Sequence, residues 1–220
     1  MSEMDLFGHP FSSYTWKALI PLYENGTPFE FRMLGPDNPE NFAEFASLWP
    51  IAKFPLLRDG ETAIFEATAI IEHLSAFHPG AVAFIPANPA LAVETRMLDR
   101  VFDNYVMTPL QAFVDHALRS AEDRDPIGVD RARRMLDTIY GWLDGRLDGR
   151  EWANGNGFSL ADCAAAPSLF YADWVHPIDA THANLRAYRA RLLARPSVAR
   201  TVDEARPYRA LFPLGAPDRD

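Results

Sequence analysis

Strand-like segments occur only in the first third of this 220-residue chain, and that restriction does most to limit the folds open to it. Short apolar runs suggest strands at Met4–Phe7, Pro28–Leu34, Phe54–Arg58 and Thr62–Phe65. Between them, apolar residues at helical spacing predict helices at Ser13–Asn25, Glu40–Leu48 and Glu66–Phe77. The turn sequence Asp59-Gly60 joins the last two strands as a hairpin. The predicted order is therefore β-α-β-α-β-β-α.

After Pro79 only helical patterns follow. The proline-containing segment 80–89 is expected to be a linker between an α/β domain (1–79) and an all-helical domain (90–220). Helices are expected at Leu91–Ala121, Pro126–Leu147, Ser159–Trp174 and Ala183–Arg195. Pro109 should bend the first of these helices, and Pro196 should end the last one. The helix over 126–147 is expected to direct inward Met135, Ile139, Trp142 and Leu143.

Composition excludes several classes of protein. With 48% hydrophobic residues the chain can bury a core, so a disordered chain is excluded. No apolar run approaches the ~18 residues of a membrane-spanning helix. The acidic opening Met1–Asp5 does not resemble a secretory signal. A net charge of −9 opposes binding to nucleic acid. We expect a cytoplasmic protein with neither nucleic-acid nor membrane partners.

The sequence offers little for metal or cysteine chemistry. None of the six histidines forms an i, i+4 pair, so no metal site is expected. The one cysteine, Cys163, excludes an internal disulfide and lies among alanines in the most apolar helix. A buried thiol of this kind is expected to be inert.

Three local features suggest binding, and each also has an ordinary structural explanation. Ser12-Ser13 lies before a helix, where hydroxyls and unpaired N–H groups favour an anion, but serine there is also the usual N-cap. In Lys53-Phe54-Pro55, a cis bond would free the backbone of Phe54 for a ligand, whereas a trans proline would simply begin the strand. At Glu66-Ala67-Thr68, the backbone N–H groups that begin the helix either form a cradle for a carboxylate or are capped by the Glu66 side chain.

The order of these features resembles the glutathione S-transferase family along essentially the whole chain. Leu6–Ser12 is similar to the opening of the phi class, and Ser12–Lys17 to the paired serines of the zeta class. Similar family motifs follow in order at Trp49–Leu57, Phe65–Ile70, Gly157–Asp162 and Arg195–Val198.

The resemblance implies a thioredoxin-like domain that binds glutathione as co-substrate and a helical domain that supplies an apolar pocket. It implies that the Ser12 hydroxyl donates to the glutathione sulfur, with Ser13 and Tyr14 as alternatives. Phe54, presented by cis-Pro55, would pair with the cysteinyl unit, and Glu66 with the Ala67 N–H would hold the γ-glutamyl end.

Two positions depart from the family pattern. Ala67 replaces the usual serine, so one hydroxyl donor to the γ-glutamyl carboxylate is missing, and Thr68 is a candidate substitute. Glu40-Asn41 stands where relatives often place His or Lys for the glycyl carboxylate, and the Glu40 carboxylate would repel the ligand there. The resemblance makes Asn41 and Ser13 candidate glutathione-binding residues, and Lys53 is expected to pair with the glycyl carboxylate.

The implied function is conjugation of the glutathione thiolate to an electrophilic apolar molecule, without a metal. The alternatives are a glutathione-dependent isomerase or dehalogenase, as in the zeta class, and a non-catalytic binding protein. Phe11, Tyr105, Phe113 and Phe212 are candidates for lining the second substrate's pocket, although aromatic residues at helical spacing more often belong to the core. The family also implies a homodimer formed by the third and fourth helices, in which Arg96 and Arg100 would pair with acids across the axis.

Overall fold

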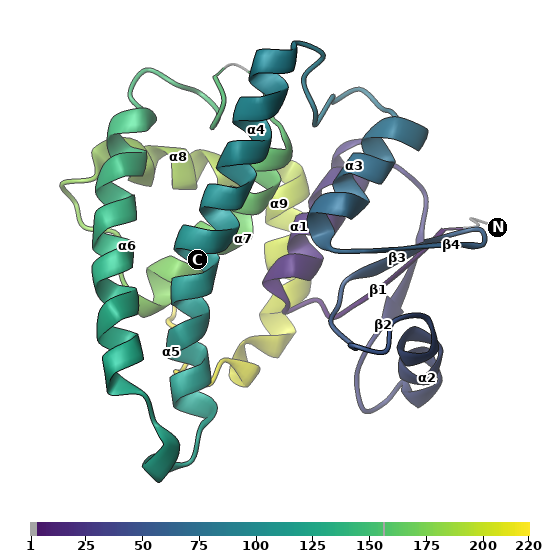
Figure 1. The fold of residues 1–220 in the computed structure, drawn as a ribbon, viewed down its shortest axis with the longest axis horizontal. Coiled ribbons are helices and arrows are strands. Elements are labelled where there is room, and N and C mark those ends of the chain that lie inside the picture. The colour runs from purple at the N-terminus through teal and green to yellow at the C-terminus, as the bar shows by residue number, and fades with distance from the viewer. Residues whose placement is uncertain (1–3, 156) are drawn as a thin grey trace.

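The computed structural model describes residues 4–155 and 157–220, and it divides into a small sheet-containing domain and a larger helical one (Figure 1). The elements of the first domain are β1 (Met4–Gly8), α1 (Ser13–Glu24), β2 (Glu30–Met33), α2 (Pro39–Leu48), β3 (Leu56–Asp59), β4 (Thr62–Phe65) and α3 (Ala67–Phe77). The sheet order is β2-β1-β3-β4, with β1 parallel to β2 and antiparallel to β3. This arrangement confirms the expected thioredoxin-like domain.

Strand β1 is buried along its whole length because helices cover both faces of the sheet. Successive side chains of a strand point to opposite faces. Leu6 accordingly belongs to the cluster that contains Leu19 of α1 and Ile70 of α3, and Phe7 to the cluster that contains Phe45 of α2. The central strand is thus fixed between α1 and α3 on one side and α2 on the other.

The second domain consists of helices. They are α4 (Pro89–Val101), a π-helical segment (Phe102–Met107), α5 (Thr108–Leu118), α6 (Pro126–Arg146), α7 (Leu160–Val175), α8 (Ala183–Ala194) and α9 (Pro196–Ala205). Figure 1 shows α4 and α5 end to end beside α6. Helix α7 is buried almost throughout and begins with a capping box of Ser159 and Asp162. None of the helices in the described ranges is both long and apolar enough to cross a bilayer.

The structure adds to two predictions about prolines. The long helix is not continuous α-helix up to Pro109. It widens into π-helix just before this proline, and the Thr108 N–H donates to the carbonyl of Asp103, five residues back. Proline has no N–H and its ring crowds the preceding turn, so the wider turn accommodates it. Pro196 ends α8 as predicted but also begins α9, because proline suits the first position of a helix.

The inward face of α6 was also partly mispredicted. Ile139 and Leu143 are buried as expected, but Met135 is 40% and Trp142 44% exposed. Leu136 and Tyr140 lie inward instead. The helix carries apolar residues on more than one face, so spacing alone did not determine which side contacts its neighbours.

Candidate functional site

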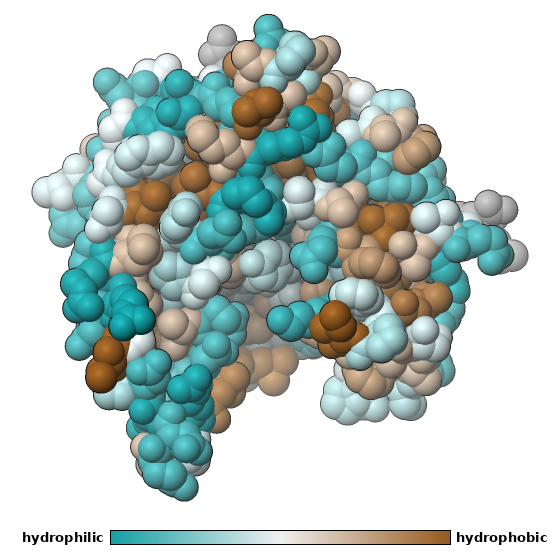
Figure 2. All heavy atoms as spheres, in the orientation of Figure 1, coloured by the Kyte–Doolittle hydropathy of each residue, from teal (hydrophilic) through white to brown (hydrophobic). Residues whose placement is uncertain are grey.

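Two adjoining cavities lie where the two domains meet. The polar cavity, of about 300 Å³, is lined by Tyr14, Lys53, Phe54, Pro55, Glu66, Ala67, Arg100, Asp103 and Asn104. The apolar cavity, of about 330 Å³, is lined by Phe11, Ser12, Ser13, Tyr14, Phe54, Met107, Leu110, Gln111, Val114, Leu118, Tyr171, Leu211, Phe212 and Pro213. Tyr14 and Phe54 belong to both linings, so a single ligand can extend from one cavity into the other. Figure 2 shows the surface hollowed between the domains.

The loop before α1 is held in one shape by contacts with the first turn of that helix. Gly8 lies so close to Thr15 that an added Cβ would come within 2.7 Å of its side chain. The His9 N–H donates to the Thr15 hydroxyl at 3.3 Å, and the Ser12 N–H donates to the His9 carbonyl at 2.9 Å. These contacts place Ser12 at the N-cap of α1, on the wall of the apolar cavity.

Ser12 is an N-cap and also retains a free donor. Its Oγ accepts the Thr15 N–H at 3.3 Å. A hydroxyl accepts and donates independently, so this bond leaves the proton available. Within the described ranges, the hydroxyl protons of Ser12, Ser13 and Tyr14 have no acceptor. Burial raises the pKa of Tyr14 to about 12, with a smaller contribution from Asp103, so its phenol stays protonated at neutral pH.

The peptide bond between Phe54 and Pro55 is cis, which decides between the two sequence interpretations. Pro55 is buried just before β3, and both residues line the polar cavity. Lys53 is exposed on the same wall, and no carboxylate of the described residues pairs with its ammonium group.

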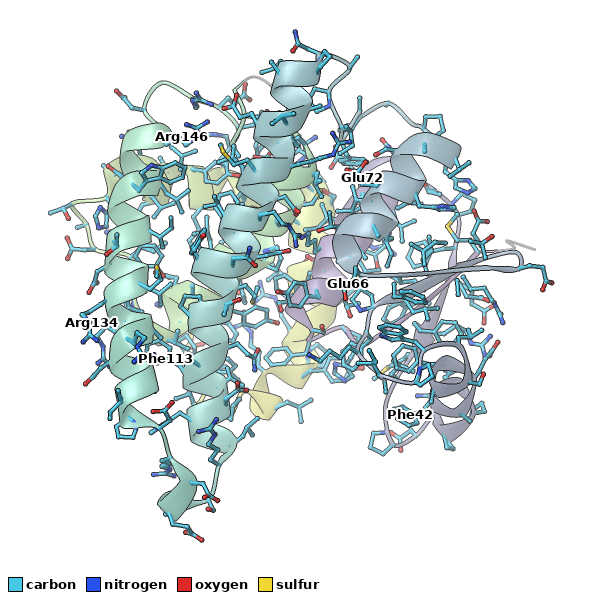
Figure 3. All side chains as sticks on the ribbon, viewed as in Figure 1. Phe42, Glu66, Glu72, Phe113, Arg134 and Arg146 are labelled. Carbon is cyan, nitrogen blue, oxygen red and sulfur yellow. The ribbon has the colours of Figure 1, made fainter. Side chains whose placement is uncertain are left out.

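Glu66 does not cap α3 with its side chain. It occupies the N-cap position with φ 71°, a left-handed conformation that is unfavourable for a non-glycine residue, and its carboxylate makes no capping hydrogen bond. The side chain lines the polar cavity instead. Figure 3 places Glu66 at the start of α3, between the domains, with Glu72 farther along the same helix. The first N–H groups of α3, beginning at Ala67, lack partners within the helix.

A network of charged side chains adjoins the polar cavity, and two of its members, Arg100 and Asp103, line it. Lys17, only 1% exposed, contacts Asp99 at 2.6 Å and Asp103 at 2.7 Å. Arg100 contacts both carboxylates at 2.6 Å and is half exposed to the cavity. The Thr68 hydroxyl donates to Asp99 at 3.0 Å and accepts from Lys17 at 2.9 Å. Burial raises the pKa of Asp103 despite these cations.

The helical domain contributed site residues that the sequence analysis missed. Arg100, Asp103 and Asn104 reach the polar cavity from the end of α4 and the π-helical segment. Asp99 and Arg100 each lie one turn before Asp103 in a helical segment that also contributes to the core, and this pattern was the available signal.

Some predicted residues lie elsewhere. Asn41 is buried between the Arg32 side chain and the Met33 carbonyl and lines neither cavity. It is on α2, the helix on which Figure 3 labels Phe42, well apart from Glu66.

The structure brings two of the four candidate pocket aromatics to the apolar cavity. Phe11 and Phe212 line the apolar cavity, as predicted. Tyr105 is 46% exposed outside it and Phe113 is packed in the core, because the π-helical segment and α5 turn other side chains to the cavity. Cys163 is fully buried, which raises the pKa of its thiol well above the usual range and supports an inert role.

The fold is a thioredoxin-like domain with an attached helical domain, and a polar cavity and an apolar cavity adjoin where the two domains meet. Residues 2–76 match the glutathione S-transferase N-terminal domain, and residues 126–191 match the C-terminal domain of the same family. The chain belongs to the glutathione S-transferase family.

Individual relatives are distant. Glutathione S-transferase GstB of Escherichia coli is 26% identical over 90% of this chain and 96% of its own. A probable maleylacetoacetate isomerase of Vibrio cholerae is 26% identical over 94% of this chain and 99% of its own. The solved glutathione S-transferase of Methylobacterium radiotolerans, in complex with glutathione sulfonate, has a TM-score of 0.78 at 26% identity, covering 90% of this chain and 94% of that one.

Proposed function

We propose that the protein is a glutathione transferase that adds the glutathione thiolate to an electrophilic apolar molecule. The observation that carries the proposal is the junction of the two cavities at Tyr14 and Phe54, with Ser12, whose hydroxyl proton is free to donate, on the apolar side. A tripeptide held in the polar cavity and paired with the Phe54 backbone would direct its thiol towards Ser12 and the apolar cavity.

The charges of the polar cavity complement those of glutathione, which has one ammonium and two carboxylate groups. Glu66 is the acceptor for the ammonium, and the start of α3 together with Arg100 receives the γ-glutamyl carboxylate. Lys53, which lacks a carboxylate partner among the described residues, receives the glycyl carboxylate. Glu40 is exposed and lines neither cavity, so repulsion of the glycyl carboxylate, a concern raised by the sequence, is not expected from it.

One hydroxyl is sufficient to activate the thiol. A free thiol has a pKa of about 8.5, and lowering it by two units requires about 2.7 kcal/mol in favour of the anion. A hydrogen bond to a charged group contributes about 1.5–3 kcal/mol, and the N-terminus of α1 adds a smaller favourable amount. No general base is needed.

Calorimetric titration with glutathione, combined with turnover of an aryl halide, tests the proposal. We expect saturable binding of one glutathione per chain and glutathione-dependent conjugation. Binding without turnover of any electrophile would favour the non-catalytic alternative, and absence of binding would refute the proposed site.

A glutathione-dependent isomerase is the second candidate. Ser12 and Ser13 both line the apolar cavity, so two adjacent hydroxyls face the same space. The Vibrio cholerae relative carries the name of such an enzyme. Isomerisation of a cis double bond in a maleyl-type diacid, faster than conjugation of an aryl halide, would favour this function over the first.

Restoring the missing hydroxyl by Ala67→Ser should strengthen glutathione binding by about 1 kcal/mol, or about fivefold in Kd. The Thr68 hydroxyl cannot substitute because its proton is donated to Asp99. Calorimetry should show the gain for Ala67→Ser but not for Ala69→Ser, an exposed position in the same turn. Equal affinities for Ala67→Ser and the parent protein would place the γ-glutamyl carboxylate elsewhere.

We further propose that the protein is a homodimer. Arg96 and Arg100, expected to pair across the axis, have partners within the chain, Glu72 for the first and the buried aspartates for the second. The outer face of α4 instead exposes Val93 by 67% and Met97 by 46%, one turn apart. Such a stripe is a candidate contact surface.

Sedimentation velocity at micromolar concentration should give about twice the chain mass of 24.7 kDa. Val93→Asp should shift the protein towards monomer. Ile127→Asp, which replaces a similarly exposed apolar residue on α6, should leave the dimer intact. A monomeric parent protein would contradict the proposal.

A further inference from the structure

A group of potential metal ligands lies outside the two cavities. The residues are Asp59 at the end of β3, His73 on α3 and His78 at the C-cap of α3. Their potential ligand atoms all lie within 4.8 Å of one another, and across 4–155 and 157–220 no other group of three such residues converges in this way. The sequence analysis overlooked the pair because the two histidines are five residues apart, and the second lies just beyond the helix.

We propose that Asp59, His73 and His78 form a binding site for a zinc-class divalent ion. Nε2 of His73 lies 2.8 Å and Nε2 of His78 lies 2.6 Å from Oδ2 of Asp59. A tetrahedral zinc ion with bonds of about 2.0–2.1 Å keeps its ligand atoms roughly 3.3 Å apart, so each imidazole needs to move away from the carboxylate by only about 0.5–0.7 Å. Two imidazoles and one carboxylate leave the fourth position to water.

The chemistry of the donors selects the ion. Imidazole suits zinc, copper and nickel, whereas calcium and magnesium prefer oxygen ligands alone. In the metal-free protein both Nε2 atoms donate to the same carboxylate oxygen, since an ionised carboxylate only accepts. The ion takes the place of these two protons, which move to Nδ1 or to solvent. His78 is one-third exposed, so the ion has a path from water.

The proposed ion would connect the far end of α3 to the β3–β4 hairpin. The helix has 11 residues, or about 16 Å, and its other end forms the wall of the polar cavity at Ala67. The proposed role is therefore structural, and it is independent of the conjugation proposed above. A zinc concentration 100 times the Kd should raise Tm by about 5–10 °C.

Cobalt(II) titration of tag-free protein, previously treated with chelator, tests the site. We expect one equivalent to bind, with the visible absorption of four-coordinate cobalt. His73→Gln and His78→Gln should each weaken binding at least about tenfold. His176→Gln is the matched control, because His176 also contacts a carboxylate, that of Asp137 at 2.6 Å, but without a second histidine. Its cobalt affinity should equal that of the parent protein.

Absence of saturable cobalt binding, or affinities in both variants within threefold of the parent value, would overturn the proposal. If either variant fails to fold, the site is tested by NMR of the parent protein instead. Substoichiometric cobalt should broaden the imidazole resonances of His73 and His78 while those of His176 and His182 stay sharp. Sharp resonances for His73 and His78 would refute the site.

Discussion

Ser12→Ala should lower kcat/KM for an aryl halide at least about tenfold while the protein remains folded. The Ser12 hydroxyl is on the wall of the apolar cavity, and its proton has no acceptor among the described residues. Its removal takes away the one hydrogen bond proposed to stabilise the thiolate. Glutathione affinity should change much less than turnover, because the ammonium and carboxylate partners remain.

Because Ser12 also caps α1, the control must separate catalysis from stability. Replacement of an N-cap serine by alanine costs about 0.5–2 kcal/mol, but replacement by glycine only a few tenths. Ser12→Gly should therefore be as inactive as Ser12→Ala but more stable in urea. Ser13→Ala and Tyr14→Phe should retain most activity. If Ser12→Gly keeps the activity of the parent protein and Ser13→Ala or Tyr14→Phe is inactive, the neighbouring hydroxyl activates the thiol instead.

Lys17→Met should destabilise the protein by about 3–5 kcal/mol, because it leaves two buried carboxylates with one half-exposed cation. Lys17 is 1% exposed and contacts both Asp99 and Asp103. The repulsion left between these carboxylates should also disturb Arg100 and weaken glutathione binding. Urea unfolding measures the first effect, and calorimetry measures the second.

The control for Lys17→Met is Arg133→Met, which removes an exposed pair with Asp130. Exposed pairs contribute under about 1 kcal/mol, so this variant should be nearly as stable as the parent protein. If Lys17→Met lowers the free energy of unfolding by less than about 1 kcal/mol, water reaches the network and its charges are not buried.

The sequence predicted the sheet-containing domain well because its signals are local. Strand alternation and the Asp59-Gly60 turn each depend on residues within a few positions, and the same holds for the start of α7 in the helical domain. The clustering of Phe54, Glu66 and Ala67 at one cavity followed from the family motifs, and the structure brings them together.

The remaining features depend on contacts between distant segments. Lys17 and Asp103 are 86 positions apart, and neither is informative alone. Tyr105 and Phe113 were misplaced because the π-helical segment changes the helix phase before α5, an effect that regular 3.6-residue spacing cannot anticipate. Asn41 was suggested by the family resemblance, but its amide is hydrogen-bonded to Arg32 and to the Met33 carbonyl, and it lines neither cavity.

The pKa of the thiol in bound glutathione tests the account most directly. It is measured from thiolate ultraviolet absorption of the complex across a pH titration, with the free protein subtracted. The account predicts a pKa about two units below the value of about 8.5 for a free thiol, and a return most of the way to that value in Ser12→Gly. A bound thiol that titrates near 8.5 in the parent protein, or one that keeps its lowered pKa in Ser12→Gly, would contradict the proposed role of Ser12.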